Sequence, residues 1–198
     1  MKVLAKNILG CFLLLTIGLN ACIFKKPEFP FEPSVSFRAM SKKSLLDGNG
    51  QVIEDSIFLD IDFKDGNGDI GLSAGDTTGQ FARRLPDKSF NPYYYNFYCT
   101  IYRRNKFTGV YERLVLPKFI DPVTGAEFET NIHGRVPPLL DKERQNPIEG
   151  TIRYNIGGLF YDVIGINKRD SIRFEVFIYD RALNQSNVIT TPAILVNE

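Results

Sequence analysis

Apolar and polar residues alternate along most of the chain from residue 34 onward. The alternation is clearest in the segments 35–39, 57–63, 152–156 and 172–178. Because successive side chains of a β-strand point to opposite faces, such a segment predicts a strand with one face on a core and the other toward water. Further strands are predicted by β-branched and aromatic residues in the segments 93–102, 110–116 and 188–196.

These patterns predict an all-β fold. Beyond residue 22, only residues 138–145 could form a short helix, with Pro137 and Pro138 at its start. About seven strands in one domain over residues 34–198 indicate an antiparallel β-sandwich. The segment 177–192 resembles the closing hairpin of immunoglobulin-like and fibronectin-III-like domains, which implies an immunoglobulin-like sandwich. Pro192 has no backbone N–H to donate, so we expect the final strand at a sheet edge or at a bulge.

Two connections between the predicted strands are long, at residues 64–91 and 117–150. Connections above about 12–15 residues are uncommon unless they are functional or contain small elements of their own. The turn residues from Asp121 to Gly125 predict the tip of an extra hairpin in the second connection. We expect any working surface of the domain on these two insertions.

The N-terminus has the design of a secretory signal. Lys2 and Lys6 precede an apolar stretch of about a dozen residues, shorter than the roughly twenty that a spanning helix needs. The stretch closes in Leu-Asn-Ala-Cys, ending at Cys22. This ending resembles the lipobox of bacterial lipoproteins, which implies a signal peptide at residues 1–21 and acylation of Cys22. A plain secretory signal with a coincidental cysteine is the alternative.

Acylation of Cys22 would fix the protein to a bilayer, because two or more acyl chains hold a protein stably where one holds it only marginally. Prolines recur through residues 22–33 and favour extended backbone, so this segment is predicted to be a tether. We therefore expect a lipid-anchored protein of the outer membrane, on its periplasmic or cell-surface face.

Composition narrows the chemistry. The chain has 198 residues with 24 basic and 23 acidic side chains. Proteins that bind nucleic acids usually have a strongly basic surface, and this balanced composition does not indicate one. His133 is the single histidine, which excludes a multi-histidine metal site, and no nucleophile motif accompanies it. Cys99 lies in an apolar strand and is expected to be a small buried hydrophobe. No catalytic residue is predicted.

The sharpest local motif is the acidic, glycine-rich stretch that follows the second predicted strand. Asp65, Asn67, Asp69 and Asp76 have the spacing of the first, third, fifth and twelfth positions of a calcium loop. Ile70 stands where an EF-hand needs glycine, and no helices flank the stretch, so an EF-hand is excluded. The stretch predicts either a Ca²⁺-binding loop or a glycine turn whose aspartates cap backbone amides.

Aromatic residues point to a second candidate surface. Tyr94, Tyr98 and Tyr102 fall on one face of the strand predicted at residues 93–102, with Tyr95 on the opposite face. A row of exposed aromatic rings marks a surface for a partner protein or for sugar rings. Cross-strand packing of the tyrosines is the alternative. The arginines that could rim such a surface are Arg83, Arg84, Arg103 and Arg104.

The segment from Phe63 to Leu72, FKDGNGDIGL, resembles a phrase in a group of uncharacterised Bacteroidota lipoproteins. These proteins combine a lipobox, a proline-rich tether, a strand ending in this phrase, and a closing hairpin with Asp-x-Ala-x-Asn-x-Ser-Asn, which runs here from Asp180 to Asn187. The resemblance implies an outer-membrane lipoprotein with an immunoglobulin-like or fibronectin-III-like sandwich, and it implies no reaction.

The sequence thus predicts a non-catalytic, lipid-anchored outer-membrane protein that acts by protein–protein contact, as an accessory subunit of a membrane assembly or transport complex. A glycan-binding surface lipoprotein of a polysaccharide-uptake system is the alternative. An apolar patch built from the two insertions would favour the partner protein, and a coplanar tyrosine platform beside acids would favour the glycan.

Overall fold

The computed structural model describes residues 27–120, 122, 125, 127–140, 146–160, 164–196 and 198. The predicted signal peptide and the predicted lipid site at Cys22 lie outside this part of the chain, as do most of the short helix considered at 138–145 and most of the hairpin tip at 121–125. Within the described residues, no helix is long and apolar enough to cross a membrane.

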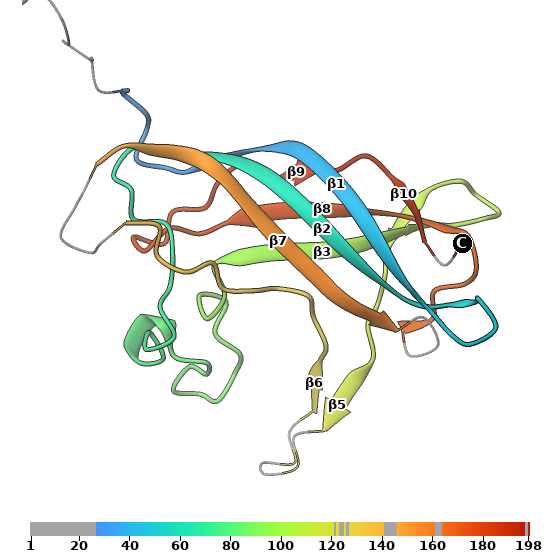
Figure 1. Cartoon of the computed structure of the whole chain (residues 1–198). Helices are drawn as coiled ribbons and strands as arrows, with labels where there is room; N and C mark the ends of the chain where they lie inside the picture. Colours follow the sequence, from blue (N-terminus) through green and yellow to red (C-terminus); the bar gives the residue numbers. More distant parts are fainter. Residues whose placement is uncertain are drawn as a thin grey trace, which may run out of the picture.

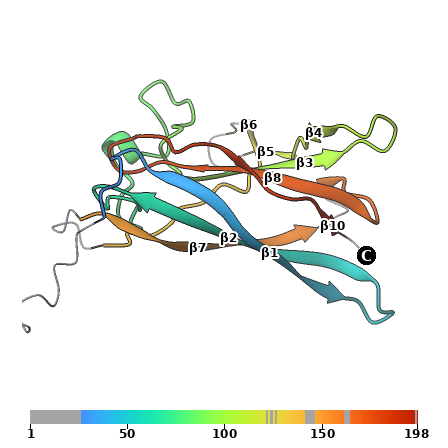
Figure 2. The same ribbon diagram turned by 90° about the horizontal axis from the view of Figure 1, so that it is seen from above.

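Two antiparallel sheets form the body of the molecule, one layer on the other (Figures 1 and 2). The first sheet contains, in spatial order, β1 (Ser34–Leu46), β2 (Val52–Asp65) and β7 (Ile148–Phe160). The second contains, in spatial order, β10 (Ile194–Val196), β8 (Asp170–Ile178), β3 (Phe97–Arg104) and β4 (Tyr111–Arg113), with β9 (Ile189–Thr190) also paired to β8.

The strand order is that of an immunoglobulin-like sandwich. The sheet β1-β2-β7 corresponds to strands A, B and E of that fold, and β8 and β3 correspond to F and C. The predicted fold class is therefore confirmed. The described residues form ten strands where about seven were expected, because one edge strand is split into β9 and β10 and the second insertion adds a hairpin.

The core lies between the two sheets and is made by the apolar face of each strand. Every second residue of β8 is buried, from Asp170 to Ile178, as the sequence alternation predicts. On β3 the buried face carries Phe97, Cys99 and Ile101. Cys99 is a free thiol that is 1% exposed, and its burial raises its pKa. The expectation of a small buried hydrophobe is confirmed.

The split edge strand follows from Pro192. β9 and β10 pair with β8 on either side of the interruption. Between them, Thr191 donates its N–H to the carbonyl of Phe174 and accepts the Phe174 N–H on its hydroxyl, at 2.9 and 3.0 Å. The Thr191 hydroxyl thus replaces one backbone hydrogen bond of the sheet beside Pro192. The final strand lies at the edge of its sheet, as expected.

Both insertions extend from the same side of the sandwich, below the sheets in Figure 1. The first carries the short 3-10 helix η1 (Gly79–Phe81). The second carries a separate two-stranded sheet of β5 (Lys118–Ile120) and β6 (Glu127–Glu129), which is the hairpin that the turn residues predict. The two insertions bring together the groups described next.

Candidate functional site

The acidic loop after β2 meets the turn after β8 in a cluster that we call the acidic corner: Asp65, Asn67, Asp69 and Asp180. Asp65 is the last residue of β2, and Asn67 and Asp69 follow in the loop. One carboxylate oxygen from each of the three aspartates lies within 4.8 Å of the others. Of the four residues that the calcium-loop spacing predicts, the structure therefore keeps Asp65 and Asp69 together and adds Asp180. Asn67 lies between the two loop aspartates in sequence, and its Oδ1 is buried.

Asp76, the fourth predicted residue, has a different role. Its carboxylate accepts hydrogen bonds from the N–H and hydroxyl of Ser73, at 2.7 and 2.8 Å, and forms an ion pair with Arg181 at 2.7 Å. The Arg181 guanidinium and these hydrogen bonds hold the pKa of Asp76 far below its usual range. The structure therefore does not bring Asp76 together with Asp65 and Asp69, as the calcium-loop spacing predicts, because its carboxylate is engaged by Ser73 and Arg181.

The acidic corner contains buried oxygen atoms without partners. Among the described residues, no group forms a hydrogen bond with either carboxylate oxygen of Asp65 or with Oδ1 of Asn67 or of Asp69. The side chain of Asp65 is completely buried. Buried polar groups are nearly always hydrogen-bonded in native proteins, and a buried charge without a partner is costly.

The proximity of the carboxylates and their removal from water both disfavour ionisation. Burial, with the negative charge of Asp180 as a smaller cause, raises the pKa of Asp65. Burial and the same neighbour raise the pKa of Asp69 to about 6. Burial also raises the pKa of Asp180, against the hydrogen bonds from Asn184 that lower it. Three acids with raised pKa values thus share one small volume.

Two glycines allow neighbouring segments to close over the loop. Gly66 donates its N–H to the carbonyl of Pro30 at 2.9 Å, and a Cβ at this position would collide with that carbonyl. Gly68 has φ +71°, a left-handed conformation that favours glycine, and a Cβ there would collide with the carbonyl of Asn146. The tether therefore covers one side of the loop, and the end of the second insertion covers the other.

The turn after β8 is held by its own side chains. Both carboxylate oxygens of Asp180 accept hydrogen bonds from Asn184, one from its backbone N–H at 2.7 Å and one from its Nδ2 at 2.8 Å. The N–H of Arg181 reaches the carbonyl of Asp69 at 3.3 Å. Sequence spacing does not indicate that Asp180 joins the loop, although its turn and the loop both belong to the resemblance to the lipoproteins. Only the folded contact brings them together.

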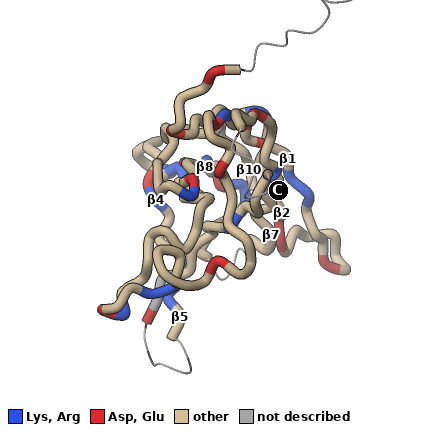
Figure 3. Tube along the Cα trace, turned by 90° about the vertical axis from the view of Figure 1, so that its left-hand side faces the viewer, with Lys and Arg blue, Asp and Glu red and all other residues tan. Residues whose placement is uncertain are grey.

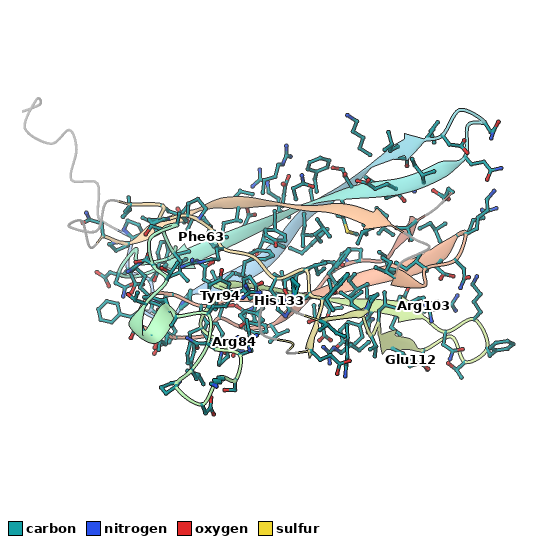
Figure 4. The ribbon with its side chains drawn as sticks, turned by 90° about the horizontal axis from the view of Figure 1, so that it is seen from below. Phe63, Arg84, Tyr94, Arg103, Glu112 and His133 are labelled. Carbon is teal, nitrogen blue, oxygen red and sulfur yellow. The ribbon has the colours of Figure 1, made fainter. Side chains whose placement is uncertain are left out.

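The two insertions and the outer face of β3 enclose a second feature, the aromatic-basic cleft, of about 820 Å³. Its lining residues are Arg83, Arg84, Lys88, Ser89, Phe90, Pro92, Tyr95, Tyr98, Arg113, Phe119, Glu127, Thr130, Asn131 and His133. In Figure 4, Arg84 lies beside His133, whereas Arg103 and Glu112 lie at the far end of β3. Arg103 and Arg104 line a separate cavity of about 230 Å³.

The three predicted tyrosines do not form a row. β3 begins at Phe97, so Tyr94 lies in the preceding turn, where the Arg135 guanidinium stands 5.2 Å from its ring. Tyr98 lines the cleft, and the Tyr102 hydroxyl donates a hydrogen bond to Glu175 at 2.7 Å outside it. The expectation of Tyr94, Tyr98 and Tyr102 on one strand face is thus corrected.

Asn91 holds the turn that precedes β3 and contains Tyr94. Its amide donates hydrogen bonds to the carbonyls of Gln80 and Ala82, at 2.8 and 2.7 Å, and its Oδ1 accepts the N–H of Tyr93 at 2.9 Å. These contacts bend the chain before β3 and tie it to η1. As a result Tyr95, which the strand pattern places on the face opposite Tyr98, lines the cleft with it.

The inner wall of the cleft is a packed aromatic layer. The ring of Tyr98 stacks on Phe177 at 4.8 Å and lies 4.4 Å from the ring of His133. His133 Nδ1 accepts the backbone N–H of Cys99 at 3.2 Å, and Gly134 pairs with Phe97 as a β-bridge. Sequence reasoning treated His133 as an isolated loop residue. Its contribution to the cleft depends on the second insertion running beside β3.

The described side chains that line the cleft are predominantly basic. They include Arg83, Arg84, Lys88 and Arg113, with Glu127 as the carboxylate among them. Figure 3 shows basic segments of the chain beside β5, whose Phe119 also lines the cleft. Exposed apolar side chains continue outward along the same segment, with Val115 and Ile120 each 71% exposed. The arrangement is suited to an anionic ligand that also has apolar groups.

Comparisons with known proteins found no match for this chain among protein families, curated proteins or solved structures. The assignment of the fold therefore depends on strand order and core, and the two candidate sites depend on their geometry and chemistry.

Proposed function

We propose that the protein is a non-catalytic, lipid-anchored module of a bacterial outer membrane that binds a partner protein through the aromatic-basic cleft, as an accessory subunit of a membrane assembly. The observation that carries this proposal is the convergence of both long insertions on one cleft. Loops placed on a rigid scaffold are where binding residues concentrate. A cleft with aromatic walls and a few charged groups is a typical binding site.

Sequence features at the N-terminus support the location. The Leu-Asn-Ala-Cys ending at Cys22 resembles a lipobox, and FKDGNGDIGL resembles a phrase of Bacteroidota lipoproteins. The described part of the tether runs directly onto the domain, where Gly66 binds Pro30 and the Lys64 amino group lies 5.2 Å from the Phe29 ring. The tether therefore joins the sandwich at the end that holds the acidic corner, away from the C-terminus (Figure 1).

The partner is inferred to present an acidic, partly apolar segment. Its carboxylates would pair with basic groups of the cleft such as Arg84, and its apolar side chains would cover Phe90 and Phe119, which are 43% and 50% exposed. Val115 and Ile120 extend the same contact area beyond the cleft. An exposed apolar patch next to a charged cleft is typical of a protein-binding surface.

Site-specific photo-crosslinking in the native membrane tests this function. Phe90, in the cleft, is replaced by p-benzoylphenylalanine in the full-length, lipidated protein, and Phe107, which is completely exposed on the turn after β3, is the matched control. We expect one membrane protein to be attached from position 90 and not from position 107. Arg84→Glu should abolish that adduct while leaving the unfolding temperature unchanged.

Either of two results would contradict the proposed function. One is the absence of any protein adduct from position 90, and the other is the same adduct from both positions. A protein that is recovered without acylation and free of the membrane fraction would contradict the anchored location.

A glycan ligand is the second candidate, because aromatic rings line the cleft and sugars stack on such rings. Phe90 and Tyr95 are inclined by 34° and Tyr95 and Tyr98 by 83°, so the rings form no flat platform. This geometry ranks the glycan below the protein partner. Saturable binding of an acidic polysaccharide that is lost in Tyr95→Ala, together with no protein adduct, would reverse the order.

A further inference from the structure

We propose that the acidic corner binds one Ca²⁺ ion through side-chain oxygens of Asp65, Asn67, Asp69 and Asp180, and that the ion ties the first insertion to the turn after β8. This inference goes beyond the proposed function, because it concerns a different site and does not depend on what occupies the cleft.

The spacing of the oxygens fits a single ion. Two oxygens bound to the same Ca²⁺ at about 2.3–2.6 Å lie no more than about 5 Å apart. One oxygen each of Asp65, Asp69 and Asp180 lies within 4.8 Å of the other two. The side-chain amide of Asn67, between the two loop aspartates in sequence, supplies a fourth donor with a buried, unpartnered Oδ1.

The unpartnered oxygens are an independent observation that points to a ligand. Asp65 is fully buried, and among the described residues neither of its oxygens accepts a hydrogen bond. The backbone amides of Asn67, Asp69 and Ile70 lower the pKa of Asp65, but they offset only part of the rise that burial causes. A cation bound between these oxygens would satisfy all of the unpartnered acceptors at once.

No cationic side chain of the described residues takes this place. Arg181 interacts electrostatically with Asp69, but its guanidinium is engaged by Asp76 and by the carbonyl of Gly71. Glu32, at the end of the tether, adds a negative charge that raises the pKa of Asp180 further. The corner therefore has an excess of negative charge that a divalent cation would neutralise.

The donor set favours Ca²⁺ among the common divalent ions. All four side chains offer hard oxygens, which suit Ca²⁺ and Mg²⁺, and no histidine or cysteine is present to favour zinc. Mg²⁺ usually keeps several waters and takes only one or two carboxylates, whereas Ca²⁺ accepts a crowded, irregular set of carboxylate and amide oxygens. Asn184 holds the carboxylate of Asp180 by two hydrogen bonds, which fixes its direction toward the loop.

The ion would fasten a junction of three segments. β2 and its loop contribute Asp65, Asn67 and Asp69, and the turn after β8 contributes Asp180. The tether packs on the same loop through Pro30 and Gly66. Removal of Ca²⁺ is therefore expected to loosen the start of the first insertion where the tether meets the sandwich.

Thermal unfolding of the full chain measures this directly. The protein is stripped with EDTA and then titrated with CaCl₂ or MgCl₂. We expect Ca²⁺ at about a hundredfold above its dissociation constant to raise the unfolding temperature by about 5–10 °C, and Mg²⁺ to raise it much less. Isothermal titration should give one Ca²⁺ per chain.

Asp180→Asn, which keeps the size of the side chain and one oxygen acceptor for the Asn184 backbone N–H, should abolish most of the Ca²⁺-dependent rise. The matched control is Glu149→Gln, an exposed acid at the same end of the sandwich, which should behave like the wild type. If Asp180→Asn does not fold, Asn67→Ala tests the same prediction. An unfolding temperature that Ca²⁺ leaves unchanged, or an equal rise in the wild type and the variants, would overturn the proposal. Neither result would affect crosslinking from position 90, so failure of the two proposals is distinguishable.

Discussion

Asp65 and Asp180 lie side by side, with an oxygen of each within 4.8 Å, although one ends the second strand and the other begins the turn near the end of the chain. The bridge between Ile70 and Asp180 and the hydrogen bond from the Arg181 N–H to the Asp69 carbonyl set their alignment. Residues far apart in sequence thus make one structural unit, on which the first insertion is mounted.

The ion pair between Asp76 and Arg181 is expected to stabilise this unit without any metal. Asp76→Asn should lower the free energy of unfolding at pH 7 by about 1–2 kcal/mol, since it weakens charge-assisted hydrogen bonds to a largely buried group. The pKa of Asp76 is lowered from its ordinary value of 3.8, so the folded state binds fewer protons than the unfolded state between the two values.

The stabilisation by Asp76 is therefore complete above about pH 4 and is lost as the pH falls through the lower, folded-state pKa. Urea unfolding of the wild type and the variant over a pH series measures this. The difference between the two proteins should shrink steadily in acid. A difference that grows in acid would contradict the assignment.

Because the backbone of Asn146 packs closely over Gly68, adding a methyl group at this position should destabilise the fold. Gly68→Ala should lower the free energy of unfolding by more than about 1 kcal/mol, because the backbone conformation is left-handed and the new Cβ would meet the Asn146 carbonyl. Gly48→Ala is the control, since nothing lies within 4 Å of a Cβ at that position. Equal stability of the two variants would mean that the loop is not covered as described.

Phe97 packs between the two sheets and should contribute strongly to stability. Its ring stacks on Tyr154 of the opposite sheet with 4.0 Å between the centroids, and it is fully buried. Phe97→Ala is expected to cost about 3–5 kcal/mol, measured by chemical unfolding. Phe107→Ala removes a completely exposed ring and should change stability by less than about 0.5 kcal/mol.

Cys99 should be unreactive in the folded protein. Its thiol is 1% exposed and its pKa is raised by burial, so little thiolate forms and reagents cannot reach it. Labelling with a thiol reagent is expected only at the rate of unfolding and to accelerate sharply in denaturant. Rapid labelling under native conditions would show that β3 opens locally or lies at the surface.

The strands and their buried faces could be predicted from the sequence because a sandwich imposes a period of two on each strand. In β2, Leu59 and Ile61 alternate with Asp60 and Asp62, and both apolar residues are completely buried. The effect of Pro192 was equally readable, because a missing N–H acts locally. The insertions were also recognisable as the places where the sandwich pattern stops.

The composition of the two sites could not be predicted in full, because tertiary contacts decide it. Asp180 joins the acidic corner through a bridge to Ile70, which no local pattern encodes. The turn that removes Tyr94 from β3 depends on Asn91 binding carbonyls in η1 and beside it. In both cases a contact between segments that are separate in sequence decides which side chains lie together.

A crystal structure determined with CaCl₂ would locate the ion itself. We expect a single strong density peak in the acidic corner, bound at about 2.3–2.6 Å to oxygens of Asp65, Asn67, Asp69 and Asp180. Asp76 should remain paired with Arg181 in that structure. A corner in which the carboxyl groups hydrogen-bond to one another or to water, with Ca²⁺ absent or bound elsewhere, would contradict the assignment.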